Sequence, residues 1–300
     1  MILRSSSRVR GVAAVASAML GAVSACNRAD TPSAEPSIVE PGATASPVRI
    51  TIAGSSALVP LVTEAANRYM RAHIDVTIQV RAGGSRQGLA QVASGAVTIG
   101  NSDVFATGAQ AAQLEDHRVA VVGFAAMAHR GSFNQTVTSL TQDQMRGVFG
   151  GQVRNWSQLG GVDQAITVIN RARSSGTRAV FGSIVLGGDS FLEGTEEQDS
   201  SGPLRSMLLE QVGAISYLAL SYRSESLAVM AYNGVEPTPE NIAAGTYPIW
   251  SYEHMYTRGP ATADVRAFLD FVASPEFQDD AVARLGFVPV GRMRVTRDHD

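Results

Sequence analysis

The chain has 300 residues, of which 45% are hydrophobic and 17% charged, a composition typical of a globular protein with room for about two domains. All 24 basic residues are arginine, and the formal net charge is −3 at pH 7. Because there is no basic excess, we do not expect nucleic acid as a partner, and an anionic ligand would have to be held by local geometry.

The N-terminus has the pattern of a secretion leader. Arg4, Arg8 and Arg10 precede an uncharged apolar run that is too short to span a bilayer. The run ends in Val-Ser-Ala before Cys26, the only cysteine, which resembles a bacterial lipobox. We therefore expect a signal peptide over residues 1–25 and lipidation of Cys26, and removal of the three arginines would change the net charge from −3 to −6. The alternative is an ordinary signal peptide with an incidental cysteine.

A proline-rich segment follows the cysteine. Pro32, Pro36, Pro41 and Pro47 lie among alanine, serine, threonine and glutamate residues. Such a segment buries too little apolar surface to fold by itself. We expect residues 26–47 to be a lipidated cysteine and a disordered tether.

Strands and helices alternate through the rest of the chain. Hydrophobic periodicity, capping residues and glycine stops predict the following elements. They are a strand at 49–53, a helix over 58–69, a strand at 74–80, a helix ending at Gly95, strands at 97–100 and 118–129, a helix from the capping box at 141–144 to 148, a strand at 165–170, a helix to about 186, a strand at 214–220, and helices at 263–272 and 275–285. This alternation predicts an α/β architecture.

Three short clusters of glycine and hydroxyl residues are each predicted to open a helix. They are Gly54-Ser55-Ser56, Gly83-Gly84-Ser85 and Ser174-Ser175-Gly176-Thr177, and the third follows Arg171. The free N–H groups at a helix start favour anions, glycine allows close approach, and a hydroxyl adds a donor. Each cluster also lies at the carboxyl end of a predicted strand, where open parallel sheets bind ligands. Together they predict a cage for a small oxyanion.

The same residues have simpler interpretations when taken singly. Ser56 and Ser175 could be ordinary N-caps, Arg171 a surface arginine, and Asp103 a turn residue. Asp103 is informative because a carboxylate beside an anion is unfavourable unless the ligand carries a proton. Near neutral pH phosphate carries one and sulfate does not, so Asp103 favours phosphate as the ligand.

The sequence contains no pattern for catalysis or for a metal. The five histidines lack a metal-binding spacing, and no serine lies in a G-x-S-x-G elbow. We therefore predict no catalytic residue, no metal site and no cofactor.

Six segments, taken in order, resemble the phosphate-binding proteins of bacterial high-affinity phosphate ABC transporters, and the resemblance spans residues 48–291. The segments are ITIAGSSALVPLV, VRAGGSRQGLAQVASGAVTIGNSD, INRARSSGTRAVF, GAISYLALSY, YPIWSYEHMYTRG and LDFVASPEFQDDAVARLGFVPVG. The resemblance implies a type II periplasmic-binding-protein fold, with two α/β lobes and phosphate in the cleft between them. It places the first lobe at 48–127 plus 240–300 and the second at 128–239.

The resemblance also implies a set of phosphate-binding residues. They are Ser55, Ser56, the amide of Ala57, Ser85, Asp103, Arg171, Ser175, Gly176 and Thr177. Arg171 would make a charge-assisted contact, and Asp103 would accept a proton from phosphate. One departure is visible, since Arg86 stands where relatives have a small residue, and it could supply a second cation or point into solvent.

The function implied is that of a receptor without catalytic activity. A lipid-anchored monomer on the extracytoplasmic face of the cell membrane would capture inorganic phosphate by lobe closure and deliver it to an ABC permease. Three alternatives are a secreted phosphatase or serine hydrolase, a receptor for another tetrahedral oxyanion such as sulfate or arsenate, and a surface protein that senses or adheres.

Overall fold

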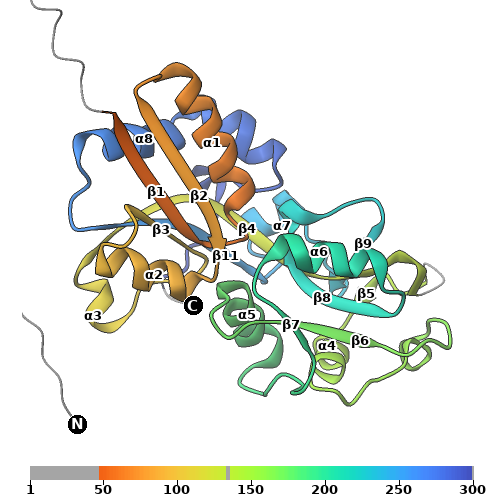
Figure 1. The fold of residues 1–300 in the computed structure, drawn as a ribbon. Helices are drawn as coiled ribbons and strands as arrows, with labels where there is room; N and C mark the ends of the chain where they lie inside the picture. The colour runs from red at the N-terminus through yellow and green to blue at the C-terminus, as the bar shows by residue number, and fades with distance from the viewer. Residues whose placement is uncertain (1–46, 133–135, 299–300) are drawn as a thin grey trace, which may run out of the picture. The chain divides into compact units, whose positions relative to one another are not determined.

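A mixed nine-stranded sheet organises the part of the chain that the computed structural model describes, residues 47–132 and 136–298 (Figure 1). The strands, in the order in which they lie side by side, are β2 (Val76–Gly83), β1 (Val48–Ser55), β3 (Ile99–Ser102), β11 (Trp250–Arg258), β4 (Leu114–His129), β8 (Ala214–Ala219), β6 (Thr167–Arg171) and β7 (Glu196–Gln198), and β9 (Leu227–Val229) also pairs with β4. A separate pair joins β5 (Ser139–Leu140) and β10 (Ala231–Tyr232).

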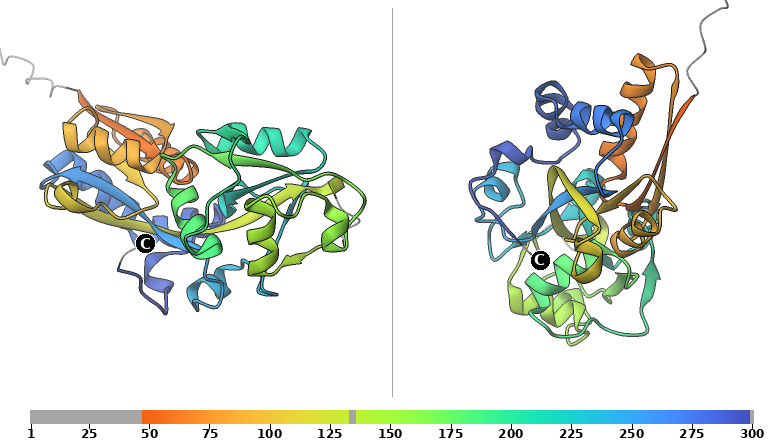
Figure 2. Two further views of the ribbon diagram at one scale, coloured as in Figure 1. Left: turned by 90° about the horizontal axis from the view of Figure 1, so that it is seen from below. Right: turned by 90° about the vertical axis from the view of Figure 1, so that its left-hand side faces the viewer.

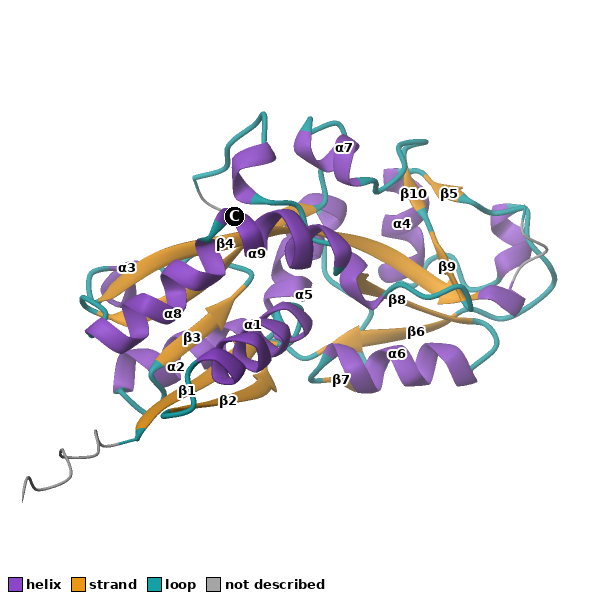
Figure 3. Cartoon of the chain, turned by 90° about the horizontal axis from the view of Figure 1, so that it is seen from above, coloured by secondary structure: helices purple, strands orange, loops and turns teal. Residues whose placement is uncertain are grey.

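Helices connect the strands and cover the sheet (Figure 3). They are α1 (Val59–Ala72), α2 (Ser85–Ser94), α3 (Gly108–Ala111), α4 (Gln142–Phe149), α5 (Gly176–Phe181), α6 (Ser201–Glu210), α7 (Pro239–Ala243), α8 (Ala263–Ala273) and α9 (Pro275–Phe277). Since β2 and β3 flank β1 in parallel, right-handed crossovers put α1 and α2 on opposite faces. Within the described ranges, none of the helices has both the length and the apolar character needed to cross a membrane.

The long strand β4 joins the two halves of the sheet (Figure 2). Its first part, Leu114–Gly123, pairs antiparallel with β11, and its second part, Phe124–Ala128, pairs antiparallel with β8. The outer strands of each half run parallel to their neighbours, as in β1–β2 and β6–β8. Both halves of the sheet therefore contain parallel strands that end in loops leading into helices.

The core explains why these segments fold as they do. In α1 the residues Leu61, Val62, Ala65 and Tyr69 recur at helical spacing and are buried, so one face of the helix packs on the sheet. In the other half the ring of Phe181 stacks on that of Tyr217 at a centroid distance of 4.5 Å. Apolar side chains thus fill the space between the helices and the sheet. The polar loops lie at the ends of the strands.

The prediction of an α/β fold is confirmed, with differences in detail. The antiparallel strand β11 and the helix α6 were not predicted, and β4 begins at Leu114, four residues before the expected start. The two long helices predicted to end near 186 and 285 each continue as a π-helical turn, at Gly182–Leu186 and Gln278–Val282. The signal peptide, Cys26 and most of the tether lie outside the described residues, and the lobe boundaries stay a prediction.

Candidate functional site

The three glycine and hydroxyl clusters lie at strand ends, as predicted. β1 ends at Ser55, β2 ends at Gly83 directly before α2, and β6 ends at Arg171, four residues before the capping residue of α5. β1 and β2 belong to one half of the sheet and β6 to the other. The loops after these strands therefore approach the same place from two sides.

Two glycines allow the second and third clusters to touch. A Cβ built on Gly84 would lie 2.5 Å from the carbonyl oxygen of Ser174, and one on Gly176 would lie 2.2 Å from Ser85 Oγ. Any side chain would clash at either position, which is why both are glycine. The contact is held by a hydrogen bond of 3.2 Å from the amide of Arg86 to the carbonyl of Ser174.

The first cluster is fitted against the strand that carries Asp103. Gly54 has a φ of +132°, and a Cβ there would lie 2.1 Å from the carbonyl oxygen of Asn101. Only glycine tolerates both conditions. The end of β1 therefore packs directly on β3, so that Asp103 follows β3 close to the other clusters.

Asp103 binds groups from the second and third clusters, although it is only 1% exposed. Its Oδ2 accepts a hydrogen bond of 2.8 Å from Thr177 Oγ1, and its amide donates to Ser85 Oγ at 2.9 Å. Its carbonyl oxygen accepts from Ser251 Oγ in β11 at 2.6 Å. Three different loops or strands thus fix Asp103 in place, two through its backbone and one through its carboxylate.

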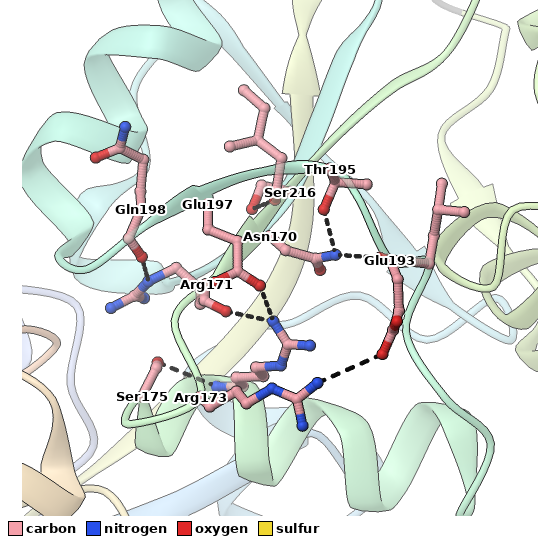
Figure 4. Close-up of polar contacts among 12 residues, drawn as sticks. Asn170, Arg171, Arg173, Ser175, Glu193, Thr195, Glu197, Gln198 and Ser216 are labelled. Carbon is pink, nitrogen blue, oxygen red and sulfur yellow. Dashed lines mark hydrogen bonds and ion pairs between the residues drawn. The ribbon is translucent and has the colours of Figure 1, made fainter.

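Arg171 occupies the centre of the same region and is 1% exposed (Figure 4). Its Nε donates to the carbonyl of Gln198 at 3.3 Å, and its Nη2 donates to Ser56 Oγ at 3.0 Å and to the carbonyl of Asp199 at 3.2 Å. Burial lowers the pKa of the Arg171 guanidinium, while the nearby Asp103 carboxylate acts in the opposite direction. An arginine keeps its charge in proteins, so a cation and a carboxylate are buried in the same region.

Ser56 connects Arg171 to a fourth helix start, which the sequence analysis missed. Its Oγ lies 3.0 Å from Ser201 Oγ and accepts the amide of Ser201 at 3.0 Å. Ser201 is the first residue of α6, and its Oγ accepts from Arg171 Nη1 at 3.4 Å. The signal was present, because Ser200-Ser201-Gly202 repeats the pattern of the other three clusters.

The hydroxyl of Tyr222 closes this side of the site. It donates to the carbonyl oxygen of Ser56 at 2.8 Å. Burial raises the pKa of Tyr222 to about 12, so the phenol is neutral at physiological pH. We call the buried residues that these hydrogen bonds connect the central polar cluster. They are Ser56, Ser85, Asp103, Arg171, Thr177 and Ser201.

Three other predicted site residues bind within their own loops. Ser175 caps α5, where its Oγ accepts the amide of Arg178 at 3.2 Å. Ser55 Oγ accepts the amide of Ala57 at 3.0 Å, so this predicted donor has a partner inside its own turn. The simpler interpretation as an N-cap therefore holds for the Ser175 hydroxyl. It does not hold for Ser56, whose hydroxyl contacts Arg171 and Ser201 and caps no helix.

Arg86 is not part of the central polar cluster. It is exposed and lines a cavity of about 380 Å³, together with Arg173 and Arg178. Arg173 pairs with Glu193 at 3.4 Å and is also exposed (Figure 4). Since these side chains lie outside the buried region, a role for Arg86 in ligand binding stays a prediction.

Two further buried polar residues were missed by the sequence analysis. Asn101 in β3 and Glu253 in β11 are both 0% exposed. The only signal in the sequence for Glu253 was an acidic residue inside an apolar segment. Burial and the neighbouring Asp103 raise the pKa of Glu253 well above its ordinary value.

The arrangement is suited to hold a small anion. One buried cation, several hydroxyls and helix starts from both halves of the sheet converge on a fixed carboxylate. Among the described residues no cluster of histidine, cysteine or acidic side chains has the geometry of a metal site. The side chains of the site supply hydrogen-bond donors and acceptors and one buried positive charge.

Comparisons with known proteins agree with this geometry. The family model described as "PBP superfamily domain" matches residues 41–276. The phosphate-binding protein PstS of Bacillus subtilis is 46% identical over 253 residues, which cover 83% of each chain. A putative phosphate ABC transporter substrate-binding protein of Clostridium perfringens, solved with bound phosphate, is 29% identical with a TM-score of 0.75 over 81% of this chain and 99% of that one.

A more distant structure supports the fold alone. An ABC-type phosphate transport receptor of Vibrio cholerae is 24% identical, with a TM-score of 0.64 over 80% of this chain and 99% of that one. The expected type II periplasmic-binding-protein fold is thus confirmed. The chain belongs to the PBP superfamily and, within it, to the PstS family of phosphate-binding proteins.

Proposed function

We propose that this protein is an extracytoplasmic receptor that binds inorganic phosphate and delivers it to an ABC permease. The names of its relatives support the proposal, since the Bacillus subtilis protein is called phosphate-binding and the Clostridium perfringens protein was solved with bound phosphate. Binding and delivery require no catalytic residue, and none is assigned.

The observation that carries the proposal is the burial of Arg171 and Asp103 in the same central polar cluster. A buried guanidinium attracts an anion, and a buried carboxylate repels one unless the anion presents a proton. Inorganic phosphate near neutral pH satisfies both groups, because it is an anion that still carries a hydrogen. Sulfate satisfies only the first.

We assign the binding contacts as follows. Arg171 makes the charge-assisted contact, Asp103 accepts the ligand's proton, and Ser56 and Ser85 supply hydroxyl donors. Thr177, whose hydroxyl donates to Asp103, binds the ligand through its backbone amide. The remaining members of the binding set act through their backbone amides or turns, and these are Ser55, Ala57, Ser175 and Gly176.

The delivery half of the proposal concerns residues outside the central polar cluster. Lipidation at Cys26 would hold the monomeric receptor at the extracytoplasmic face of the cell membrane, with residues 27–47 as its tether. Two lobes, 48–127 plus 240–300 and 128–239, would close over phosphate and present it to the permease. The sequence pattern around Cys26 and the family of the chain support this part.

Calorimetric titration tests the proposed function directly. Purified protein is stripped of bound anion and titrated with phosphate, sulfate and arsenate in separate runs. We expect saturable 1:1 binding of phosphate and no comparable heat from sulfate. Equal binding of sulfate, or no binding of any of the three anions, would contradict the proposal, and turnover of a generic phosphomonoester by the same preparation would favour an enzyme instead.

A further inference from the structure

Glu253 is a buried acid that the proposed phosphate contacts do not use. It lies in β11, is 0% exposed, and has no cationic side chain bonded to it among the described residues. Of the seven buried side-chain polar atoms that lack a hydrogen-bond partner in that part of the chain, five belong to Asn101, Asp103 and Glu253. An unpaired buried carboxylate is strongly unfavourable, so this concentration of polar atoms requires an explanation.

The strand register brings Glu253 to Asp103. β11 runs antiparallel to β3 with Met255 opposite Asn101. The last pair of this ladder is His254 with Ser102, and Glu253 and Asp103 each lie one position beyond it. Ser251, two residues earlier, donates to the carbonyl oxygen of Asp103 at 2.6 Å, which fixes β11 against this residue.

The atoms of the two carboxyl groups are not equivalent. Asp103 Oδ2 accepts from Thr177, whereas Asp103 Oδ1 and both oxygens of Glu253 lack a partner with hydrogen-bond geometry among the described residues. The carboxyl groups nevertheless lie near enough for Asp103 to raise the pKa of Glu253. A single proton shared between the two groups would satisfy both.

The charges around Glu253 also favour a protonated carboxyl group. It faces the carboxyl of Asp103 and the neutral phenol of Tyr222, and Asn101 is uncharged. The cation of Arg171 lies near Asp103, and the neighbouring His254 is bonded to Asp116 at 2.8 Å. With both acids ionised, one guanidinium would face two carboxylates, and the buried site would be negative before any anion entered.

We propose that Glu253 is a positioning residue that holds a proton and donates it in a hydrogen bond to Asp103 Oδ1. The pair then carries one negative charge, and the Asp103 carboxylate is held between Glu253 and Thr177 with lone pairs left to accept the proton of the ligand. The inference rests on the proposed function to the extent that Asp103 is the acceptor for phosphate. It adds Glu253 as the group that keeps this acceptor oriented and singly charged.

Two variants of Glu253 test whether a hydrogen-bond donor at this position is enough or whether the titratable carboxyl group itself is needed. Glu253→Gln keeps a donor of the same length but removes the titratable proton, and Glu253→Met keeps the approximate length without a donor. We expect phosphate affinity within about threefold of wild type for the glutamine variant, and a loss of about tenfold or more for the methionine variant. Glu115→Gln, at a partly exposed acid of β4 that pairs with Arg266, is the matched control and should leave affinity unchanged.

Infrared spectroscopy detects the proton in the wild-type protein, and a folded Glu253→Gln then assigns it to Glu253. Wild-type protein is labelled with ¹³C at the glutamate carboxyl carbons, and the carbonyl stretch of a protonated carboxylic acid is sought at pH 7. We expect an isotope-shifted band that disappears in Glu253→Gln. Absence of that band, or its persistence in Glu253→Gln, would overturn the inference.

The affinities give independent grounds for rejection. The inference is also overturned if Glu253→Met binds phosphate as wild type does, or if a folded Glu253→Gln loses as much affinity as the methionine variant. If wild type itself binds no phosphate, the proposed function fails, and the infrared band alone then decides whether Glu253 holds a proton.

Discussion

Under the proposed function, Arg171 is the residue on which anion binding should depend most, because it is the buried cation of the central polar cluster. It makes hydrogen bonds to the hydroxyls of Ser56 and Ser201 and to backbone carbonyls at Gln198 and Asp199. These contacts hold the guanidinium in one orientation before a ligand arrives. A donor that is already held in its binding orientation loses less conformational freedom when the anion binds, so the affinity for the anion is higher.

Replacement of Arg171 by alanine should weaken phosphate binding. Hydrogen bonds to charged groups contribute about 1.5–3 kcal/mol, which corresponds to about a 10- to 150-fold rise in Kd. Isothermal calorimetry measures the change, and circular dichroism verifies that the variant folds. Arg173→Ala is the control, since Arg173 is exposed and its ion pair within the described part of the chain is with Glu193. An unchanged Kd for a folded Arg171→Ala would remove this residue from the binding set.

Asp103 is the residue that we propose distinguishes phosphate from sulfate. A carboxylate that only accepts hydrogen bonds disfavours a fully ionised ligand, so discrimination arises from repulsion as well as attraction. Asp103→Asn introduces a group that can also donate. We expect this variant to gain sulfate affinity and to lose much of the preference for phosphate.

Competition of sulfate against labelled phosphate measures the change in preference. Asp279→Asn, at an exposed acid paired with Arg292, serves as the control and should compete as wild type does. If Asp103→Asn discriminates as sharply as wild type, then another group reads the ligand's proton.

At the scale of elements, helix caps and strand ends account for most of what could be predicted. The second and third clusters open helices as predicted, because glycine and serine at a helix start have strong local signatures. The first cluster lies at a strand end as predicted, but α1 begins three residues later, with Leu58 at its N-cap. β11 was missed because it is buried on both faces and carries Glu253 and His254, so neither alternation nor an apolar run marked it. α6 was missed because Gly202 and Pro203 occupy its first turn, where proline is tolerated although it usually signals a break.

The buried contacts of the site could not be predicted from local sequence patterns. Ser201 bonds to Ser56, 145 positions away in the sequence, and Glu253 lies near Asp103, 150 positions away. No hydrophobic period or capping rule connects such distant positions. The resemblance to a family supplied the binding set, but it did not supply these two residues.

The capping box of α4 allows a test of stability that leaves the site untouched. Thr141 Oγ1 accepts the amide of Gln144 at 3.2 Å, and Gln144 Oε1 accepts the amide of Thr141 at 2.8 Å. Thr141→Ala should lower the free energy of unfolding by about 1 kcal/mol, which lowers Tm by about 2–4 °C in a domain of this size. Differential scanning calorimetry measures the shift.

The control for this change is Thr141→Ser, which keeps the capping hydroxyl and should melt close to wild type. Phosphate affinity should be the same in all three proteins, since α4 contributes nothing to the central polar cluster. Equal melting temperatures for the alanine and serine variants would mean that the cap is not stabilising.

At the scale of the whole molecule, the mixed sheet places one binding region at the junction of two halves. The alternation of strands and helices predicted the α/β class, but it could not reveal that β4 and β11 run antiparallel at the centre. The order of strands in space depends on long-range pairing. The division into two lobes at 48–127 plus 240–300 and 128–239 remains a prediction.

Cys26 is the position at which the whole receptor would be attached to the membrane. Cys26→Ser removes the thiol that a lipid would modify and should release the protein into the soluble fraction. Phosphate affinity should not change, because the binding residues all lie after residue 47. Fractionation of cells without detergent, followed by immunoblotting, measures the distribution. A variant that stays with the membranes would contradict the lipid anchor.

The burial of the central polar cluster has a kinetic consequence. Ser56, Asp103, Arg171 and Thr177 are each no more than 2% exposed, so a ligand cannot reach them by diffusion through this arrangement of the loops. Entry and escape both require the loops to separate, which breaks contacts such as Ser56–Arg171 and Thr177–Asp103. The residence time of phosphate is then set by how often the protein opens. A partner that pulls these loops apart would release the ligand faster without competing for it.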